Sequence, residues 1–122
     1  PLYPADYLTD QAERTYAAEI VREKMLHHLR EELPYTTAVI VDRFEEAGDD
    51  GLMTIACVIL VEAASQKGIV LGAGGGALKA LGIEARRRLS ERLDKTVHLA
   101  LWVKLDKNWT KRPKRARELG YL

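Results

Sequence analysis

A glycine-rich stretch at residues 68–79 carries the clearest chemical signal in this sequence of 122 residues, because six of the nine glycines lie between Gly68 and Gly82. A short apolar run precedes the clustered glycines, and a helical pattern follows them at once. A backbone without Cβ atoms that leads into a helix N-terminus presents free N–H groups to a ligand and favours an anion. The stretch therefore predicts a phosphate-binding loop at the start of a helix.

Two kinds of phosphate ligand fit this loop. Residues 72–77 satisfy G-x-G-x-x-A, the pattern that binds the pyrophosphate of a dinucleotide, and residues 72–75 satisfy G-x-x-G, which clamps a nucleic-acid backbone. In the nucleic-acid interpretation, basic side chains add a salt-dependent attraction, and apolar residues before the loop, together with the strand predicted at 52–63, form a floor for the bases. The candidate contacts from this part of the sequence are Lys67, Gly68, Ile69, Val70, Gly72, Ala73, Gly74, Gly75, Gly76, Lys79 and Arg86.

Residue types that serve catalysis or bind metals do not gather in this sequence. His27 and His28 are neighbours on a predicted helix and so point apart, and Cys57 lies in an apolar run predicted as core. The phosphate-binding pattern G-x-x-x-x-G-K-[ST] of nucleotide hydrolases is missing, so GTP hydrolysis cannot be credited to this chain. We expect a non-catalytic chain that holds no metal and no cofactor.

The net charge of +1 hides a strong asymmetry along the chain. Residues 1–63 contain 5 Lys and Arg against 13 Asp and Glu, whereas residues 64–122 contain 14 against 5. The basic half holds the glycine loop, which favours a polyanion as partner, although two oppositely charged halves can also face each other. A single cysteine and the lack of an apolar run of membrane-spanning length favour a cytoplasmic protein.

Hydrophobic periodicity predicts an α+β domain in the order α-β-β-α-α-β, with helices on one face of a small sheet. The predicted elements are a helix at 10–32, strands at 36–45 and 52–63, a turn of helix capped by Ser65, a helix at 76–93 and a strand at 97–104. Residues 1–9 are predicted as a linker, 10–106 as the folded domain, and 107–122 as a basic tail with a short helix at 113–119. Because the first residue is Pro1, we expect a longer protein with a further domain.

The order of elements argues against a dinucleotide. The run 69–71 is short for a buried parallel strand, and the 19 residues after Val103 offer no third parallel strand. A short helix, a G-x-x-G turn, a longer helix and a sheet edge are the parts that bind about four nucleotides of a single strand. The alternatives that stay open are a dinucleotide-binding fragment of an oxidoreductase and a module that docks on a protein or a membrane surface.

The chain resembles the C-terminal KH domain of the Era family of bacterial ribosome-assembly GTPases. The resemblance includes Ser65-Gln66-Lys67-Gly68-Ile69 and extends in register over segments 3–10, 22–24, 30–34, 82–86, 97–104, 108–109 and 117–121. It implies a type II KH fold with a three-stranded mixed sheet and a short basic C-terminal helix. It also implies binding of the single-stranded 3′ end of small-subunit ribosomal RNA in a 30S assembly intermediate, and an N-terminal GTPase domain that would hold GTP and Mg²⁺. Peripheral contact with the inner face of the cell membrane is a further expectation.

The same resemblance implies that the basic tail contacts RNA beyond the groove, and the candidates there are Lys107, Trp109 and Lys111. Trp109 either stacks on a base or packs, and Trp102, on the outer face of its predicted strand, has the same two alternatives. One departure concerns the loop, where Ala73 and Gly74 stand in place of the family's usual basic residue. Phosphate contact must then come from backbone amides and nearby lysines, and we expect a flexible loop that orders on binding.

Overall fold

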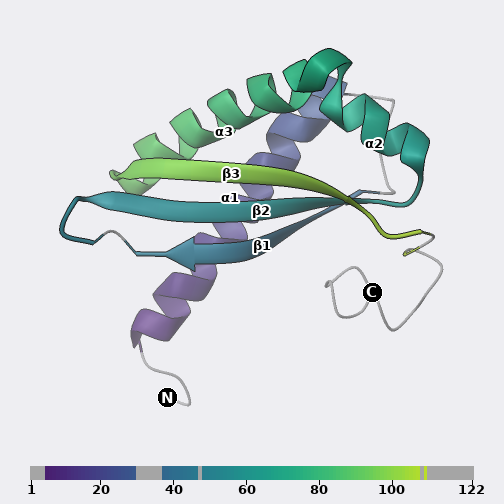
Figure 1. Cartoon of the computed structure of the whole chain (residues 1–122). Helices are drawn as coiled ribbons and strands as arrows, with labels where there is room; N and C mark the ends of the chain where they lie inside the picture. Colours follow the sequence, from purple (N-terminus) through teal and green to yellow (C-terminus); the bar gives the residue numbers. More distant parts are fainter. Residues whose placement is uncertain (1–4, 30–36, 47, 108, 110–122) are drawn as a thin grey trace.

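The structure is a computed structural model that describes residues 5–29, 37–46, 48–107 and 109. Its elements are α1 (Ala5–Leu29), β1 (Ala38–Glu45), β2 (Leu52–Val61), α2 (Ala64–Leu71), a 3₁₀ helix η2 (Ala73–Gly75), α3 (Gly76–Leu93) and β3 (Thr96–Leu105). This order confirms the predicted α-β-β-α-α-β arrangement, with the glycine-rich loop between the second and third helices (Figure 1).

The three strands form one mixed sheet in the order β1-β2-β3. β1 and β2 are antiparallel and are joined by residues 46–51, while β2 and β3 are parallel because α2 and α3 connect them. A bulge between Val41 and Arg43 interrupts the pairing of β1 with β2. β2 is therefore the central strand, and β3 is an edge strand that runs beside α3 (Figure 1).

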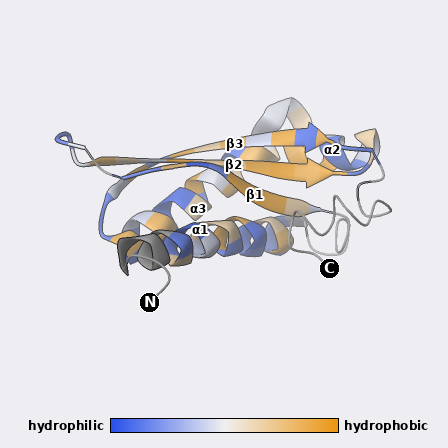
Figure 2. Cartoon of the chain, turned by 90° about the horizontal axis from the view of Figure 1, so that it is seen from below, coloured by the Kyte–Doolittle hydropathy of each residue, from blue (hydrophilic) through white to orange (hydrophobic). Residues whose placement is uncertain are grey.

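The core lies between one face of this sheet and the helices, as the alternation of β2 predicts. Alternate residues of β2 are buried on that face and meet buried residues of α1 and α3. Figure 2 shows that most residues of the strands are hydrophobic, whereas hydrophobic and hydrophilic residues alternate along α1. The buried side chains include Ala17, Val21 and Met25 of α1, Met53, Ile55, Cys57, Ile59 and Val61 of β2, and Leu81, Ala85 and Leu89 of α3.

The opposite face of the sheet carries a smaller apolar cluster at one end. Trp109 is 1% exposed and forms this cluster with Ala38 and Leu60. Two backbone hydrogen bonds hold the chain after β3 in place: Asp106 N–H donates to the Val61 carbonyl at 2.8 Å, and Trp109 N–H donates to the Asp106 carbonyl at 3.2 Å. Trp102, farther back along β3, is 57% exposed.

Several boundaries differ from the sequence-based prediction. α1 begins at Ala5 rather than at Asp10, so residues 5–9 are helical and not linker; they contain no proline or glycine that would stop a helix. α2 begins one residue before Ser65, and the Gln66 side chain supports its start, because Gln66 Oε1 accepts the N–H groups of Glu62 at 2.8 Å and Ala63 at 3.2 Å. The predicted end of the first helix near residue 32 and the tail helix at 113–119 lie outside the described residues.

Within the described ranges, no single helix is long and apolar enough to cross a membrane. Taken together, α2 and η2–α3, which are bent by 43° at the loop, are long and apolar enough by length and composition only. Three of their apolar side chains, Val70, Leu81 and Leu89, are buried in the core.

Candidate nucleic-acid interface

Gly72 shapes the loop, because no other residue fits its backbone. Its φ of 72° and ψ of 177° belong to a region that is essentially restricted to glycine. A Cβ at this position would lie 2.6 Å from Ala77 Cβ and 2.9 Å from Ala77 N. The N–H of Gly72 ends α2 by donating to the Gly68 carbonyl at 2.9 Å. Gly72 thus turns the chain sharply and lets the start of α3 pack directly against the end of α2.

The next glycines present the backbone at the start of α3. Gly74 (φ 61°, ψ 22°) and Gly75 (φ 76°, ψ 10°) are both left-handed, and Gly76 returns to the right-handed helix with φ −65°. Consecutive residues of opposite handedness turn successive N–H groups toward one side and form an anion-binding concavity, to which the first turn of α3 adds its dipole. Open space lies next to Gly74, Gly75 and Gly76, with no described atom within 4 Å of an added Cβ. The loop therefore leaves room for a ligand at the start of α3, although Gly75 N–H itself donates to the Gly72 carbonyl at 3.1 Å.

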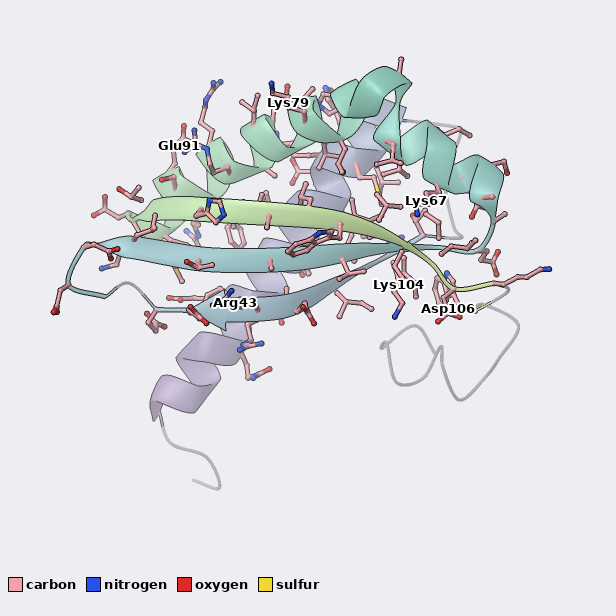
Figure 3. The ribbon with its side chains drawn as sticks, viewed as in Figure 1. Arg43, Lys67, Lys79, Glu91, Lys104 and Asp106 are labelled. Carbon is pink, nitrogen blue, oxygen red and sulfur yellow. The ribbon has the colours of Figure 1, made fainter. Side chains whose placement is uncertain are left out.

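A groove of about 350 Å³ runs from this loop between α3 and β3. Within the described part of the chain, its wall combines apolar side chains with two cations, Lys79 and Arg86, and no carboxylate. These cations lie seven residues apart on one side of α3, as the sequence predicts, and Figure 3 shows Lys79 on the first part of α3. The lining residues are Gly75, Leu78, Lys79, Gly82, Ile83, Arg86, Leu99 and Leu101. Such a wall suits flat bases beside a chain of phosphates.

Larger hollows elsewhere fit a polyanion less well. One of about 540 Å³, between α1 and α3, is lined by Glu23, Glu84 and Glu91 as well as by four cationic or titratable side chains. Another of about 770 Å³, between residues 11–19 of α1 and the end of α3, includes Glu13 and Glu19. Carboxylates in these walls repel phosphates. The charge of the lining residues, and not the volume of the hollow, therefore identifies the candidate site.

The two sides of α3 differ in charge. Ile83 and Arg86 face the groove, whereas Glu84 turns toward α1, where its Oε2 lies 2.8 Å from His28 Nε2. The hydrogen bond with His28 lowers the pKa of the Glu84 carboxyl from its ordinary value. In the described part of the chain, Lys79 and Arg86 form no ion pair, so their charges are available to a ligand.

One predicted wall of the groove is wrong. The sequence placed the base-binding floor on strand 52–63, but β2 is the central strand and its helix-facing residues are buried under α1 and α3. Leu99 and Leu101 of the edge strand β3 form that wall instead. The prediction for Val70 is also wrong: its side chain is 1% exposed and belongs to the core. Ile69 is partly buried against the same core, while Lys67 and Gly68 are exposed on α2.

The three RNA-contact candidates predicted in the tail have different outcomes. Lys107 is exposed just after β3 but does not line the groove. Trp109 is buried against Leu60 and cannot stack on a base in this conformation, which corrects its assignment as an RNA contact. Lys111 lies outside the described residues.

Sequence reasoning missed five groove residues: Leu78, Gly82, Ile83, Leu99 and Leu101. A signal for Ile83 was present, because positions 79, 83 and 86 are separated by four and three residues and so share a helix side with the two predicted cations. No group of three or more His, Cys, Asp and Glu side chains that could hold a metal occurs among the described residues.

The family model of the KH domain matches residues 32–110, a range that includes all three strands, α2, α3 and the groove. The chain belongs to the KH domain family. Full-length relatives of this KH domain are named GTPase Era: the protein of Geobacter metallireducens is 48% identical over 122 residues, covering 99% of this chain and 41% of its own length. That of Brucella suis is 50% identical over 118 residues, covering 97% and 38%. The chain thus spans about two fifths of these relatives.

Solved structures of Era share the fold of this KH domain. Era of Aquifex aeolicus bound to GDP and AlF4⁻ superposes with a TM-score of 0.81 at 39% identity, over 88% of this chain and 36% of that one. Era in complex with MgGDPNP and nucleotides 1506–1542 of 16S ribosomal RNA matches with the same TM-score, identity and coverage.

Proposed function

We propose that this KH domain binds single-stranded RNA along the groove between α3 and β3, and that its RNA is the 3′ end of small-subunit ribosomal RNA. The observation that carries the proposal is the groove itself: it begins at a glycine loop with open space beside Gly74, Gly75 and Gly76, and Lys79 and Arg86 are the only charged residues that line it in the described ranges. The choice of ribosomal RNA is supported by the related Era structure that holds nucleotides 1506–1542 of 16S RNA.

Each part of the groove has a separate task in this proposal. The amides of the loop and the first turn of α3 bind phosphate oxygens, and the missing Cβ atoms of Gly74 and Gly75 let the sugar–phosphate chain come close. Ile83, Leu99 and Leu101 offer apolar surface to the bases. Lys79 and Arg86 attract the strand over a longer range, and salt screens this attraction.

The wider setting is also part of the proposal. We place the domain in an Era-like GTPase of the cytoplasm, where a separate domain binds GTP and Mg²⁺ and the KH domain contacts a 30S assembly intermediate. The likeness to GTPase Era over 99% of this chain supports that setting. Peripheral contact with the inner face of the cell membrane belongs to the same proposal.

The test uses two substitutions of one loop glycine. An added Cβ at Gly74 meets no described atom within 4 Å, and Asn and Asp both tolerate its left-handed backbone. Gly74→Asn therefore controls for the side chain, and Gly74→Asp adds only a negative charge where a phosphate should lie. We expect Gly74→Asp to weaken binding of a fluorescent single-stranded RNA with the 16S 3′-end sequence about tenfold more than Gly74→Asn, a repulsion of about 1.4 kcal/mol.

Salt dependence provides the second readout. Each phosphate contact of a single strand adds roughly 0.7 to the slope of log affinity against log salt. Lys79→Gln and Arg86→Gln should each lower that slope, because both cations line the groove. Equal binding by the Asp and Asn variants, or a slope that neither glutamine changes, would refute the proposal. Retention on an NAD(P) resin or co-sedimentation with liposomes, without RNA binding, would favour the dinucleotide or membrane alternatives.

A further inference from the structure

Trp102 is a large aromatic side chain that the described part of the chain leaves uncovered, on the face of the sheet away from the helices. It is 57% exposed, whereas the other tryptophan, Trp109, is 1% exposed on the same face. Trp102 pairs in register with Val58 of β2, and Val58 pairs with Ile40 of β1, so the indole ends a row of half-buried apolar residues. An indole exposed at the edge of a sheet offers a flat apolar face on which a partner can stack.

The position of Trp102 connects it to the groove. Side chains alternate along β3, so that Leu99 and Leu101 line the groove and Trp102 stands on the other face of the same strand. β3 pairs only with β2 within the described sheet, so its outer edge separates the groove from Trp102 without another described strand between them. A polymer that leaves the groove across this edge reaches the indole next.

The charges near Trp102 favour a nucleic acid over a protein. Lys104 is exposed on the same face two residues along β3, and Figure 3 shows it at the end of the strand near Asp106. Lys107 is exposed just beyond. Neither lysine forms an ion pair with a residue that the structure describes. The apolar row is narrow, because Ile40 and Val58 are half-buried, and a stable protein interface needs about 800 Å² on each side.

We propose that Trp102 stacks on a base of the RNA strand that continues beyond the groove, with Lys104 contacting the adjoining phosphate. This inference rests on the proposed function and extends it from one face of β3 to the other. Stacking on an indole tolerates any base, so Trp102 would lengthen the bound segment without adding sequence preference.

The experiment compares RNA lengths. A tetranucleotide fills the groove only, and a dodecanucleotide of the 16S 3′-end sequence can reach both sites. Trp102→Ala should weaken binding of the dodecanucleotide roughly 5- to 100-fold, the effect of losing one stacked base, and leave the tetranucleotide within about twofold. Trp102→Phe should restore most of the loss because it keeps an aromatic face, whereas Trp102→Leu should not. The dodecanucleotide should quench the indole fluorescence of Trp102, and the tetranucleotide should not.

The outcomes separate this inference from the proposed function. If the wild-type domain binds neither RNA, both fail. If it binds both, and Trp102→Ala binds the dodecanucleotide as tightly as wild type does, only the inference fails. The exposed indole would then favour a protein partner. Equal losses of affinity for both RNAs would also overturn the inference, since they would mean that the indole stabilises the structure of the groove and does not contact RNA.

Discussion

Gly68, Gly72 and Gly74 lie within seven residues of one another, yet the structure predicts three different responses to alanine. At Gly72 the new Cβ would lie 2.6 Å from Ala77 Cβ, in a backbone conformation that L side chains avoid. The conformational strain costs about 1–3 kcal/mol, and the overlap with the neighbouring atoms adds a similar amount. We therefore expect Gly72→Ala to lower the free energy of unfolding by about 3 kcal/mol or more, a large share of the roughly 5–15 kcal/mol that is typical of a domain.

The two companion substitutions have no such overlap, because no described atom lies within 4 Å of an added Cβ at either position. Gly74 is left-handed, so Gly74→Ala should cost about 1–2 kcal/mol. Gly68 lies inside α2, and Gly68→Ala should raise stability by up to about 1 kcal/mol, because alanine is the better helix former. The predicted order of stability is Gly68→Ala, wild type, Gly74→Ala, Gly72→Ala.

Urea unfolding followed by circular dichroism measures this order directly, and equal slopes across the series confirm that the same transition is compared. RNA binding by each folded variant shows whether the loop geometry also matters for function: Gly72→Ala should weaken it most, because the clash moves the start of α3. A Gly72→Ala variant as stable as wild type, or a Gly74→Ala variant less stable than Gly72→Ala, would refute the steric role assigned to Gly72.

Three further predictions concern the rest of the domain. Trp109→Ala should lower stability by about 3–5 kcal/mol, because the ring is buried, whereas Trp102→Ala should change it by less than about 1 kcal/mol; urea midpoints compare the pair. Burial raises the pKa of the Cys57 thiol to about 12, so an aromatic disulfide reagent at about pH 8 should label the folded domain only as fast as it unfolds, and rapid labelling would contradict this. His28 lowers the pKa of Glu84, so this carboxylate stabilises the fold above its ordinary pKa of 4.5 and loses that contribution as the pH falls through its lower folded value; in acid titrations of stability, Glu84→Gln should lack this part of the decrease.

Much of the site was predictable because its signals are local. The φ values that clustered glycines allow and the helical spacing of Lys79 and Arg86 depend on neighbours within a few residues, and the structure confirms both. The groove wall was not predictable in the same way. Which strand lies beside α3 depends on the sheet order, and the same alternation of apolar residues suits a central strand and an edge strand.

The sequence by itself determined the order of the elements and the glycine-rich turn between α2 and α3, since periodicity and glycine content encode these directly. Only the tertiary structure decided that β3 rather than β2 lines the groove, that Val70 and Trp109 are buried, and that Trp102 is exposed. These outcomes depend on which residues distant in sequence cover one another. A buried and an exposed tryptophan seven positions apart look alike in the sequence, and only the fold shows that Trp109 packs against Ala38 and Leu60.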